Sequence, residues 1–265
     1  MPDRVDRVPP ARSSPESVDG VVHLPHSALT AYYPDGDAQA RERFIRTAFD
    51  DTAGDYNRLE RILGLGTGSW YRRQALLRAG LAPGMQVLDL GMGTGLVSHE
   101  ILHVTNEPQR LIGVDPSPGM MAQAHLPPQV RCLVGRAEAL PVPDASIDFL
   151  VMGYALRHIE DFSVACAEFR RVLKPGGRLL ILEITKPGGR IATALLKLYM
   201  RGALPLLARF VSKAEGTPRL WRYYWDTIAA CVAPAEVLAT LRAAGLHDAG
   251  RYVELGIFSE YGARG

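Results

Sequence analysis

The segment Val87-Leu88-Asp89-Leu90-Gly91-Met92-Gly93-Thr94-Gly95 joins an apolar run to three alternating glycines. Such a run ending in glycines is typical of a buried parallel strand that turns into a helix. Glycine at this turn permits positive φ and close approach of a ligand to the backbone. The N-terminus of the following helix offers N–H groups that have no partner within the helix. The segment therefore predicts a strand–loop–helix unit that binds a polar ligand.

Strands and helices alternate along the chain around this segment. Helical spacing covers residues 96–103 and 162–173, and short apolar runs predict strands at 86–90, 110–114, 130–134, 147–152 and 178–184. Lys174-Pro175-Gly176-Gly177 is expected to end the second helix before the last strand begins. This alternation predicts a doubly wound α/β fold, in which helices cover both faces of a mostly parallel sheet.

The flanking regions differ from this pattern. Residues 1–40 are rich in proline and scattered charges, which predicts a flexible or loosely docked arm. Residues 41–265 are then a single domain. Within it, helical sequence at 41–80, with helices at 41–63 and 72–79, and at 190–245 would cover a substrate pocket. Residues 251–254 and 257–261 predict a closing hairpin around Leu255-Gly256.

The composition narrows the classes of partner. Thirty basic residues against 28 acidic ones give a net charge of +2, which argues against a nucleic-acid partner. The cysteines Cys132, Cys166 and Cys231 lie far apart, so we expect neither a metal site nor a disulfide framework. No signal-peptide pattern or long apolar span is visible, and a cytoplasmic location is therefore the expectation.

Two features bear on the ligand of the glycine loop. A dinucleotide fingerprint has the pattern G-x-G-x-x-G or A, but Leu96 stands at its last position here, which weakens a nicotinamide interpretation. Asp115 ends the second predicted strand, where a carboxylate can accept hydrogen bonds from two ribose hydroxyls. The alternative is that Asp115 only caps the helix that follows Pro116.

The chain resembles the class I S-adenosylmethionine (SAM)-dependent methyltransferases, and more narrowly the ubiquinone/menaquinone-biosynthesis C-methyltransferases. The wider resemblance rests on the glycine loop, Asp115, Ala137-Glu138-Ala139-Leu140-Pro141 and Val172-Leu173-Lys174-Pro175-Gly176-Gly177. The narrower one rests on Ala53-Gly54-Asp55-Tyr56-Asn57, Tyr71-Arg72-Arg73, Ala155-Leu156-Arg157-His158 and Leu182-Glu183-Ile184-Thr185-Lys186-Pro187. The resemblance implies a Rossmann-like methyltransferase fold with a seven-stranded sheet, a helical substrate cover, and SAM as cofactor.

The resemblance also implies a set of cofactor-binding residues. Thr94 and the loop glycines would hold the methionine part of SAM, Asp115 the ribose, Arg136 and Ala137 the adenine, and Gly153 would lie beside the sulfonium. The full set is Asp89, Gly91, Gly93, Thr94, Gly95, Asp115, Arg136, Ala137 and Gly153. The chain departs from the family at three positions: Arg136 stands where Asn is usual, Gly153 where Ser is frequent, and His158 where Asn is usual.

Three residues are candidates for the chemistry. The resemblance implies that Tyr56 and Arg157 face the reacting centre. A phenol carbon becomes nucleophilic when the ring hydroxyl loses its proton, and Arg157 can stabilise the phenolate but is a poor base. The alternative is that Arg157 only forms a structural salt bridge. His158 has a suitable intrinsic pKa for a base, although it could merely begin a helix. Glu183 and Asp226 are further acid–base candidates, and Tyr71, Tyr154 and Tyr223 could offer aromatic faces to a sulfonium.

We therefore expect a methyltransferase that acts on a small aromatic or apolar molecule, with C-methylation of a quinol or phenol as the leading hypothesis. O- or N-methylation of another metabolite is the alternative, and a nicotinamide oxidoreductase or a non-catalytic binding module are remote ones. The apolar stretch 192–211, interrupted by Lys197, Arg201 and Arg209, could line the pocket, contact a membrane surface, or pack as an amphipathic cover, which we favour. Peripheral membrane contact and a homodimer both stay open.

Overall fold

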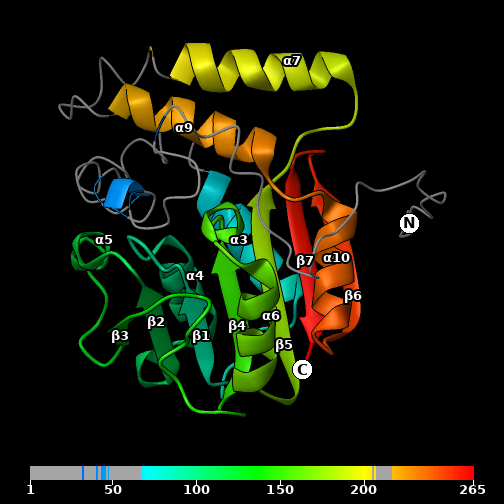
Figure 1. The fold of residues 1–265 in the computed structure, drawn as a ribbon. Coiled ribbons are helices and arrows are strands. Elements are labelled where there is room, and N and C mark those ends of the chain that lie inside the picture. The colour runs from blue at the N-terminus through cyan, green and yellow to red at the C-terminus, as the bar shows by residue number, and fades with distance from the viewer. Residues whose placement is uncertain are drawn as a thin grey trace.

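The computed structural model describes residues 67–204 and 217–265, together with residues 32, 40, 43–45, 47 and 206. Its centre is a seven-stranded sheet in the order β3-β2-β1-β4-β5-β7-β6 (Figure 1). The first five of these strands are parallel, and the last two run antiparallel to their neighbours. The strands are β1 (Val87–Leu90), β2 (Leu111–Asp115), β3 (Arg131–Val134), β4 (Ile147–Gly153), β5 (Leu173–Ile184), β6 (His247–Glu254) and β7 (Phe258–Arg264).

The strand order places the glycine loop at a crevice in the sheet. From β1 the chain proceeds to β2 and β3 on one side, and then returns to lay β4 and β5 on the other side. Val87 of β1 pairs with Leu111 of β2 and with Phe149 of β4. Every residue of β1 is buried, as expected for a strand covered on both faces. In open α/β sheets ligands bind outside the carboxyl ends of the strands at such a switch point.

Helices cover both faces of the sheet. On one face, α6 (Phe162–Val172) and α10 (Pro234–Ala243) bury Phe169, Leu241 and their apolar neighbours against β4 and β5. On the other face, α3 (Thr67–Arg78) and α4 (Leu96–Thr105) bury Leu76 and Ile101. Short helices complete the layers: η2 (Pro108–Arg110), α5 (Pro118–Ala122) and η3 (Leu156–His158). The doubly wound fold predicted from the sequence is confirmed.

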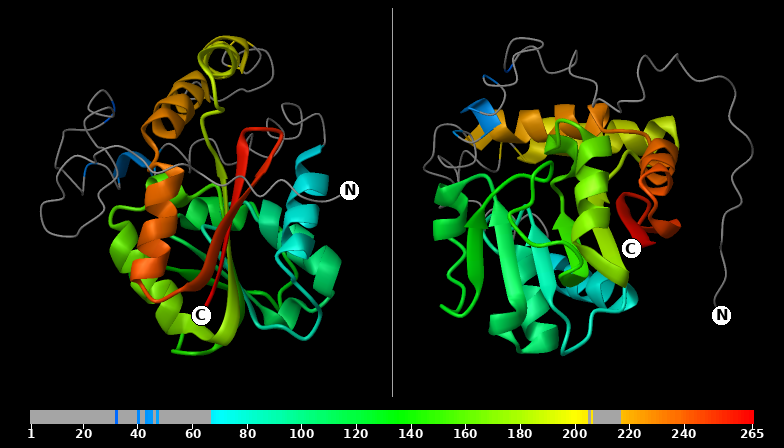
Figure 2. Two further views of the ribbon diagram at one scale, coloured as in Figure 1. Left: turned by 90° about the vertical axis from the view of Figure 1, so that its right-hand side faces the viewer. Right: turned by 60° about the horizontal axis from the view of Figure 1, so that its bottom comes forward.

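A third group of helices lies above the carboxyl ends of the parallel strands. It consists of α7 (Arg190–Leu198), the π-helix η4 (Tyr199–Ala203) and α9 (Thr217–Ala230). Figures 1 and 2 show α7 as the outermost element, with α9 between it and the sheet. Met200 and Leu204 pack on Tyr224 and Ile228 in a cluster separate from those of the sheet. The segment 190–245 was expected to cover the substrate pocket, but its last helix, α10, packs on α6 and β6 instead. The described part of the cover therefore consists of α7, η4 and α9.

Several predicted boundaries were wrong. The run Lys174-Pro175-Gly176-Gly177 was expected to lie between the helix and the last strand. It instead forms the irregular beginning of β5. Leu173 pairs with Ile147, the register then shifts, and the C-terminal Gly265 exchanges backbone hydrogen bonds with Gly176 and Gly177. The hairpin strands β6 and β7 are also longer than expected. The predicted arm at 1–40 and the predicted helix at 41–63 lie almost wholly outside the described residues.

Candidate functional site

The glycine loop joins β1 to α4 in a conformation that requires glycine. Gly91, Gly93 and Gly95 have φ values of +67°, +51° and +78°. A Cβ atom at Gly91 would lie 2.7 Å from the Cβ of Ala155, so the loop also packs closely on the segment after β4. The amides of Gly91 and Met92 donate to the Val114 carbonyl of β2 at 2.8 and 3.2 Å. The loop is thus held between β2 and the segment that follows β4, and these two strands lie on either side of β1.

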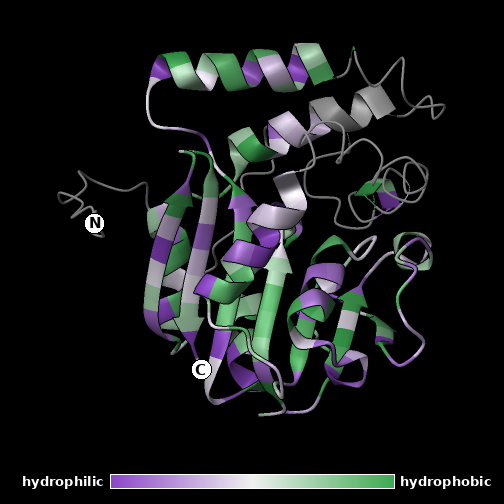
Figure 3. Ribbon diagram, turned by 180° about the vertical axis from the view of Figure 1, so that it is seen from behind, coloured by the Kyte–Doolittle hydropathy of each residue, from purple (hydrophilic) through white to green (hydrophobic). Residues whose placement is uncertain are grey.

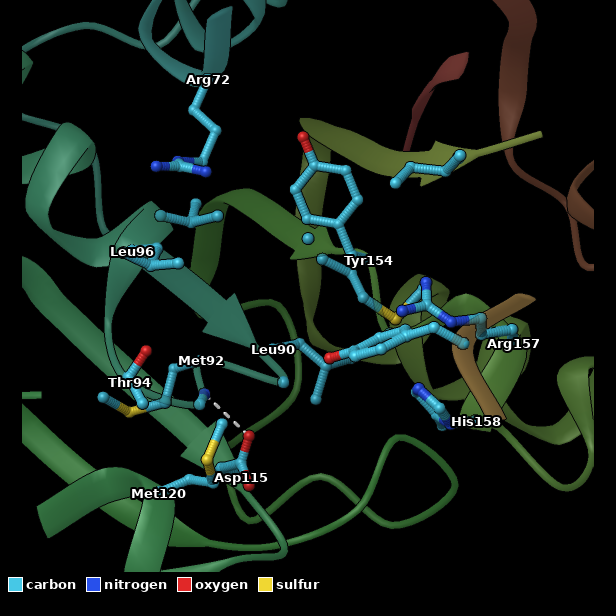
Figure 4. A pocket seen from close by; sticks show the side chains of 18 of the residues that line it. Arg72, Leu90, Met92, Thr94, Leu96, Asp115, Met120, Tyr154, Arg157 and His158 are labelled. Atoms are coloured by element: carbon cyan, nitrogen blue, oxygen red, sulfur yellow. Dashed lines mark hydrogen bonds between the residues drawn. The ribbon is translucent and has the colours of Figure 1, made fainter. Parts of the chain in front are cut away.

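Asp115 fixes the loop from the neighbouring strand. Its Oδ2 accepts a hydrogen bond from the Gly93 amide at 2.8 Å (Figure 4), and its Oδ1 accepts from the Ser117 amide at 2.8 Å. The cap of α5 is Ser117, whose Oγ accepts from the Met120 amide. Asp115 is therefore not the helix cap that was the alternative interpretation, and its carboxylate borders the cavity described next.

A cavity of about 590 Å³ lies between the carboxyl ends of the strands and the helical cover. Its cofactor end includes the predicted residues Gly91, Gly93, Thr94, Asp115, Arg136, Ala137 and Gly153. Its other end is lined mainly by apolar and aromatic side chains, among them Tyr71, Tyr199, Met200, Leu204, Tyr224 and Phe258. Such an elongated site can hold a polar cofactor and an apolar partner side by side.

Two of the predicted cofactor residues do not line this cavity. Gly95 begins α4, where a Cβ atom would lie 3.0 Å from Ala124, which indicates a packing role. Asp89 is wholly buried beneath the loop, where its Oδ2 accepts from Ser98 Oγ at 2.6 Å. Its Oδ1 has no hydrogen-bond partner among the described residues. Burial, with the nearby Asp115 carboxylate adding to it, raises the pKa of Asp89 to about 7.

The part of the cavity near Arg136, which the resemblance assigned to adenine, carries charge at its rim. Arg136 Nη2 lies 2.9 Å from Glu160 Oε2, and Arg136 Nε lies 3.7 Å from Glu138 Oε2. The Arg136 side chain is 43% exposed, so it stands at the edge of the cavity with two carboxylates beside it. Gly153 lies deeper, and a Cβ atom there would lie 2.7 Å from Val97 Cγ2. The serine that is frequent in the family would therefore collide with Val97 in this chain.

Arg72 is a functional candidate that the sequence interpretation did not single out. It is 2% exposed, and its guanidinium points into the cavity toward the side of Leu96 and Thr94 (Figure 4). Its Nη2 lies 3.5 Å from Ser69 Oγ. A buried guanidinium is a strong partner for a carboxylate. The residues at this end thus fit SAM, with Asp115 available to the ribose and Arg72 to the methionine carboxylate. The only sequence signal was the string Tyr71-Arg72-Arg73.

Arg157 lies in the cavity wall beside residues of both ends, since Ala155, two positions before it, lies against Gly91, and its own guanidinium lies over Tyr224. Its Nη1 lies 2.6 Å from Glu183 Oε1, its amide donates to Glu183 Oε2 at 3.4 Å, and its guanidinium lies 4.8 Å from the ring centre of Tyr224. Glu183 lies near the carboxyl end of β5, level with the segment that follows β4, because β4 and β5 are adjacent parallel strands. Arg157 thus forms the buried ion pair that was the structural alternative for it, and it does so in the wall of the cavity.

His158 follows Arg157 in η3 and also lines the cavity. Its ring stacks on Tyr223 with ring centres 5.8 Å apart, and Nδ1 lies 3.3 Å from the Tyr223 hydroxyl. Tyr223 is buried behind it, in edge-on contact with Tyr32 and Phe44. The imidazole is therefore held in place from behind, by an element far from it in sequence.

Four tyrosines and Asp226 were further candidates. Tyr56 lies outside the described residues. Tyr71 and Tyr154 both line the cavity, and Tyr154 has a φ of +60°, which is unusual for a side chain of this size. Burial raises the pKa of Tyr71 far above its usual value, so this phenol stays protonated. Asp226 accepts a hydrogen bond from the Tyr32 hydroxyl at 2.7 Å and does not line the cavity.

The chain matches proteins of one family over most of its length. The model of the ubiE/COQ5 methyltransferase family matches residues 37–259. A demethylmenaquinone methyltransferase of Deinococcus radiodurans is 31% identical over 230 residues, which is 84% of this chain and 93% of that protein. A ubiquinone/menaquinone biosynthesis C-methyltransferase UbiE of Geobacter sulfurreducens is 31% identical over 211 residues, covering 77% and 81% of the two chains.

Solved structures agree with the fold. A SAM-dependent methyltransferase of Aquifex aeolicus superposes with a TM-score of 0.52 at 23% identity, covering 73% of this chain and 88% of that one. A SAM-dependent methyltransferase of Thermotoga maritima, described as a possible histamine N-methyltransferase, gives a TM-score of 0.57 at 20% identity and covers 82% and 98%. Taken with the glycine loop and Asp115, the family match over residues 37–259 identifies the chain as a SAM-dependent methyltransferase of the ubiE/COQ5 family.

Proposed function

We propose that this methyltransferase transfers the SAM methyl group to a ring carbon of a phenol or quinol. The observation that carries the proposal is the buried guanidinium of Arg157 at the boundary between the cofactor residues and an apolar, aromatic chamber. The C-methyltransferase activity in the name of the Geobacter relative supports the same assignment. An apolar chamber with the Arg157 guanidinium in its wall favours a flat, apolar ring that carries an ionisable hydroxyl.

SAM supplies an electrophilic methyl group, and the chain has to align the ring and make it nucleophilic. In our proposal Arg157 stabilises the negative charge that develops on the ring oxygen, since an arginine stays protonated and cannot itself take the proton. Glu183 and Tyr224 hold the guanidinium in one orientation. This charge forms when the hydroxyl loses its proton. It is consumed when the ring carbon takes the methyl group and the sulfonium leaves as a neutral thioether, after which the ring carbon loses its own proton.

His158 is the residue that we assign as proton acceptor. An unperturbed imidazole has a pKa of about 6.5, which suits a general base near neutral pH. The stacked Tyr223 fixes the ring beside Arg157, so the acid–base group and the charge-stabilising group lie on the same wall of the cavity. We therefore propose Arg157 and His158 as the catalytic residues. Tyr56, which lies outside the described residues, is proposed as a third.

O-methylation is a second candidate, and His158 is the observation that favours it. An imidazole beside a bound hydroxyl can make the oxygen itself the nucleophile. Turnover on an acceptor panel separates the candidates: phenols and quinols with an open ortho carbon, the same compounds with both ortho carbons blocked, and primary amines. Our proposal expects turnover with the first group alone. Equal turnover with blocked rings supports O-methylation, and turnover with amines alone contradicts both candidates.

A further inference from the structure

Helix α7 carries an apolar face that is turned away from the protein. Ile191, Leu195 and Leu198 are 79%, 62% and 68% exposed. They occupy positions i, i+4 and i+7, so they lie on one side of the helix. The opposite side, continued in η4, packs on α9 through Met200 and Leu204. Figure 3 shows apolar residues recurring along this outermost helix. Because α7 is already anchored by its inner side, its exposed apolar side is available for a partner that the described residues do not supply.

A cationic flank runs beside this apolar face. Arg190, Lys197 and Arg201 are exposed and occupy positions i, i+7 and i+11 of the same helical run. From Thr185 to Ala214 the sequence holds basic residues but no aspartate or glutamate. Gly189, Thr193 and Ala194 form a shallow hollow together with Arg190 and Lys197. The flank therefore complements an anionic partner, and the adjoining face an apolar one.

The β6–β7 hairpin supplies a second, independent feature at the same end of the molecule. Its turn has positive φ at both central residues, +51° at Leu255 and +74° at Gly256, and Leu255 is 80% exposed. Asn or Gly is usual at such a position, and a larger side chain costs about 1–2 kcal/mol. The hairpin rises toward α7 (Figures 1 and 2). The fold thus holds an apolar side chain in solvent against its backbone preference.

This hairpin tip also belongs to the cavity entrance. Leu255, Trp70 and Tyr199 all line the cavity and are nevertheless 80%, 61% and 40% exposed. The entrance is thus bordered by large apolar side chains, one each from the hairpin, α3 and η4. An apolar rim that continues into an amphipathic cationic helix is the pattern of a surface that lies in the interfacial layer of a membrane.

We propose that the outer face of α7 and the cavity rim dock on the surface of an anionic lipid bilayer, with α7 lying in the plane of the headgroups. The apolar face would enter the boundary of the acyl chains, and Arg190, Lys197 and Arg201 would contact lipid phosphates. No helix of the described residues is long and apolar enough to cross a membrane. The docking does not depend on which acceptor the enzyme methylates.

Flotation of the full-length chain with vesicles tests the proposal. Vesicles of phosphatidylcholine alone are compared with vesicles that contain 30 mol % phosphatidylglycerol (about the anionic share at which electrostatic attraction becomes appreciable). We expect binding to the anionic vesicles, weaker binding to the neutral ones, and a marked loss in 0.5 M salt (about three times physiological strength). Failure of the wild type to float with anionic vesicles would overturn the proposal.

Variants locate the contact. Ile191→Ser with Leu195→Ser should weaken anionic-vesicle binding by about tenfold or more, and Lys197→Glu with Arg201→Glu by about fivefold per charge. Val164→Ser is the matched control, because Val164 is 44% exposed on α6 and belongs to neither α7 nor the cavity rim. Leu255→Asn should also weaken binding while leaving the melting temperature equal or higher, since Asn accepts this backbone conformation more readily. That combination separates loss of docking from loss of folding.

Two results would contradict the assigned surface. If the Ile191→Ser/Leu195→Ser variant floats as the wild type does, the membrane contact is elsewhere. If instead the wild type is a dimer that does not float, and light scattering shows this variant to be a monomer, then the α7 face joins two copies of the chain and the lipid proposal is wrong.

Discussion

Arg157 Nη1 and Glu183 Oε1 lie 2.6 Å apart, and their side chains are only 3% and 0% exposed. The two residues come from the segments that follow β4 and end β5, which are parallel neighbours. A buried ion pair of this kind has a large desolvation cost and is weak support for stability by itself. It does hold the guanidinium in a single orientation at the cavity wall, where a bound ring oxygen would meet it.

The pair determines which substitution tests Arg157. Arg157→Ala leaves Glu183 buried without its partner, which costs about 3–5 kcal/mol, so loss of activity there would be uninformative. Arg157→Lys keeps the charge and loses the planar fork. We expect Arg157→Lys to lower kcat by about 10–10²-fold, a fraction of the effect of removing a charge-stabilising donor, while the Kd for SAM stays within about twofold. Near-normal kcat in a folded Arg157→Lys enzyme would make the residue a purely structural ion-pair member.

Asp115 should govern cofactor affinity. Asp115→Asn removes the negative charge and one of the two oxygens that accept from the loop and from a ribose. We expect SAM binding to weaken by about 1.5–3 kcal/mol, measured by titration calorimetry. Asp144→Asn is the control, because Asp144 forms an exposed ion pair with Arg171 away from the cavity. Equal SAM affinity in Asp115→Asn and the wild type would exclude Asp115 from the cofactor site.

Gly93 and Gly84 form a matched pair for the loop. Both have positive φ, +51° and +86°, so alanine strains the backbone at either position by about 1 kcal/mol. A Cβ atom at Gly84 meets nothing within 4 Å, whereas at Gly93, a residue of the cavity wall, it would lie 3.3 Å from Met120 Cε. Both variants should lose similar stability, but only Gly93→Ala should lose SAM affinity, by about tenfold. Equal SAM affinities of the Gly93→Ala and Gly84→Ala variants would show that the loop is only a packing turn.

Asp89 should make the stability of the fold depend on pH. Its pKa is about 7 in the folded chain, against about 3.9 in an unfolded one. Between these values the folded state binds more protons, so the free energy of unfolding falls as pH rises from about 4 to about 7. Asp89→Asn removes this titration. The free energy of unfolding of the variant, relative to that of the wild type, should therefore be higher at pH 8 than at pH 5. Urea unfolding at the two pH values measures the difference, and an identical gap at both would contradict the raised pKa.

The sequence predicted the features that depend on local pattern. The apolar run before Gly91 and the position of Asp115 were sufficient to predict β1, the glycine loop and the end of β2, because strand–loop–helix units impose these residue types. The role of Gly95 and the burial of Asp89 were not predictable, since both depend on packing against distant residues such as Ala124 and Ser98.

Contacts between remote segments account for the remaining differences. The string Tyr71-Arg72-Arg73 contributes to the family resemblance, but it does not indicate that the Arg72 guanidinium is buried in the cavity. The contact between His158 and Tyr223 joins residues 65 positions apart. The start of β5 was misplaced because Pro175 and Gly176 usually interrupt regular structure, whereas here Gly265 supplies the missing backbone partners.

The position of the transferred methyl group is the decisive measurement. The enzyme is incubated with SAM that carries a ¹³C-labelled methyl group and with a phenol or quinol acceptor that it turns over, and the product is examined by carbon NMR. We predict a labelled methyl bound to a ring carbon, with the hydroxyl still free. A labelled methyl on oxygen or nitrogen, with none on the ring, would contradict C-methylation.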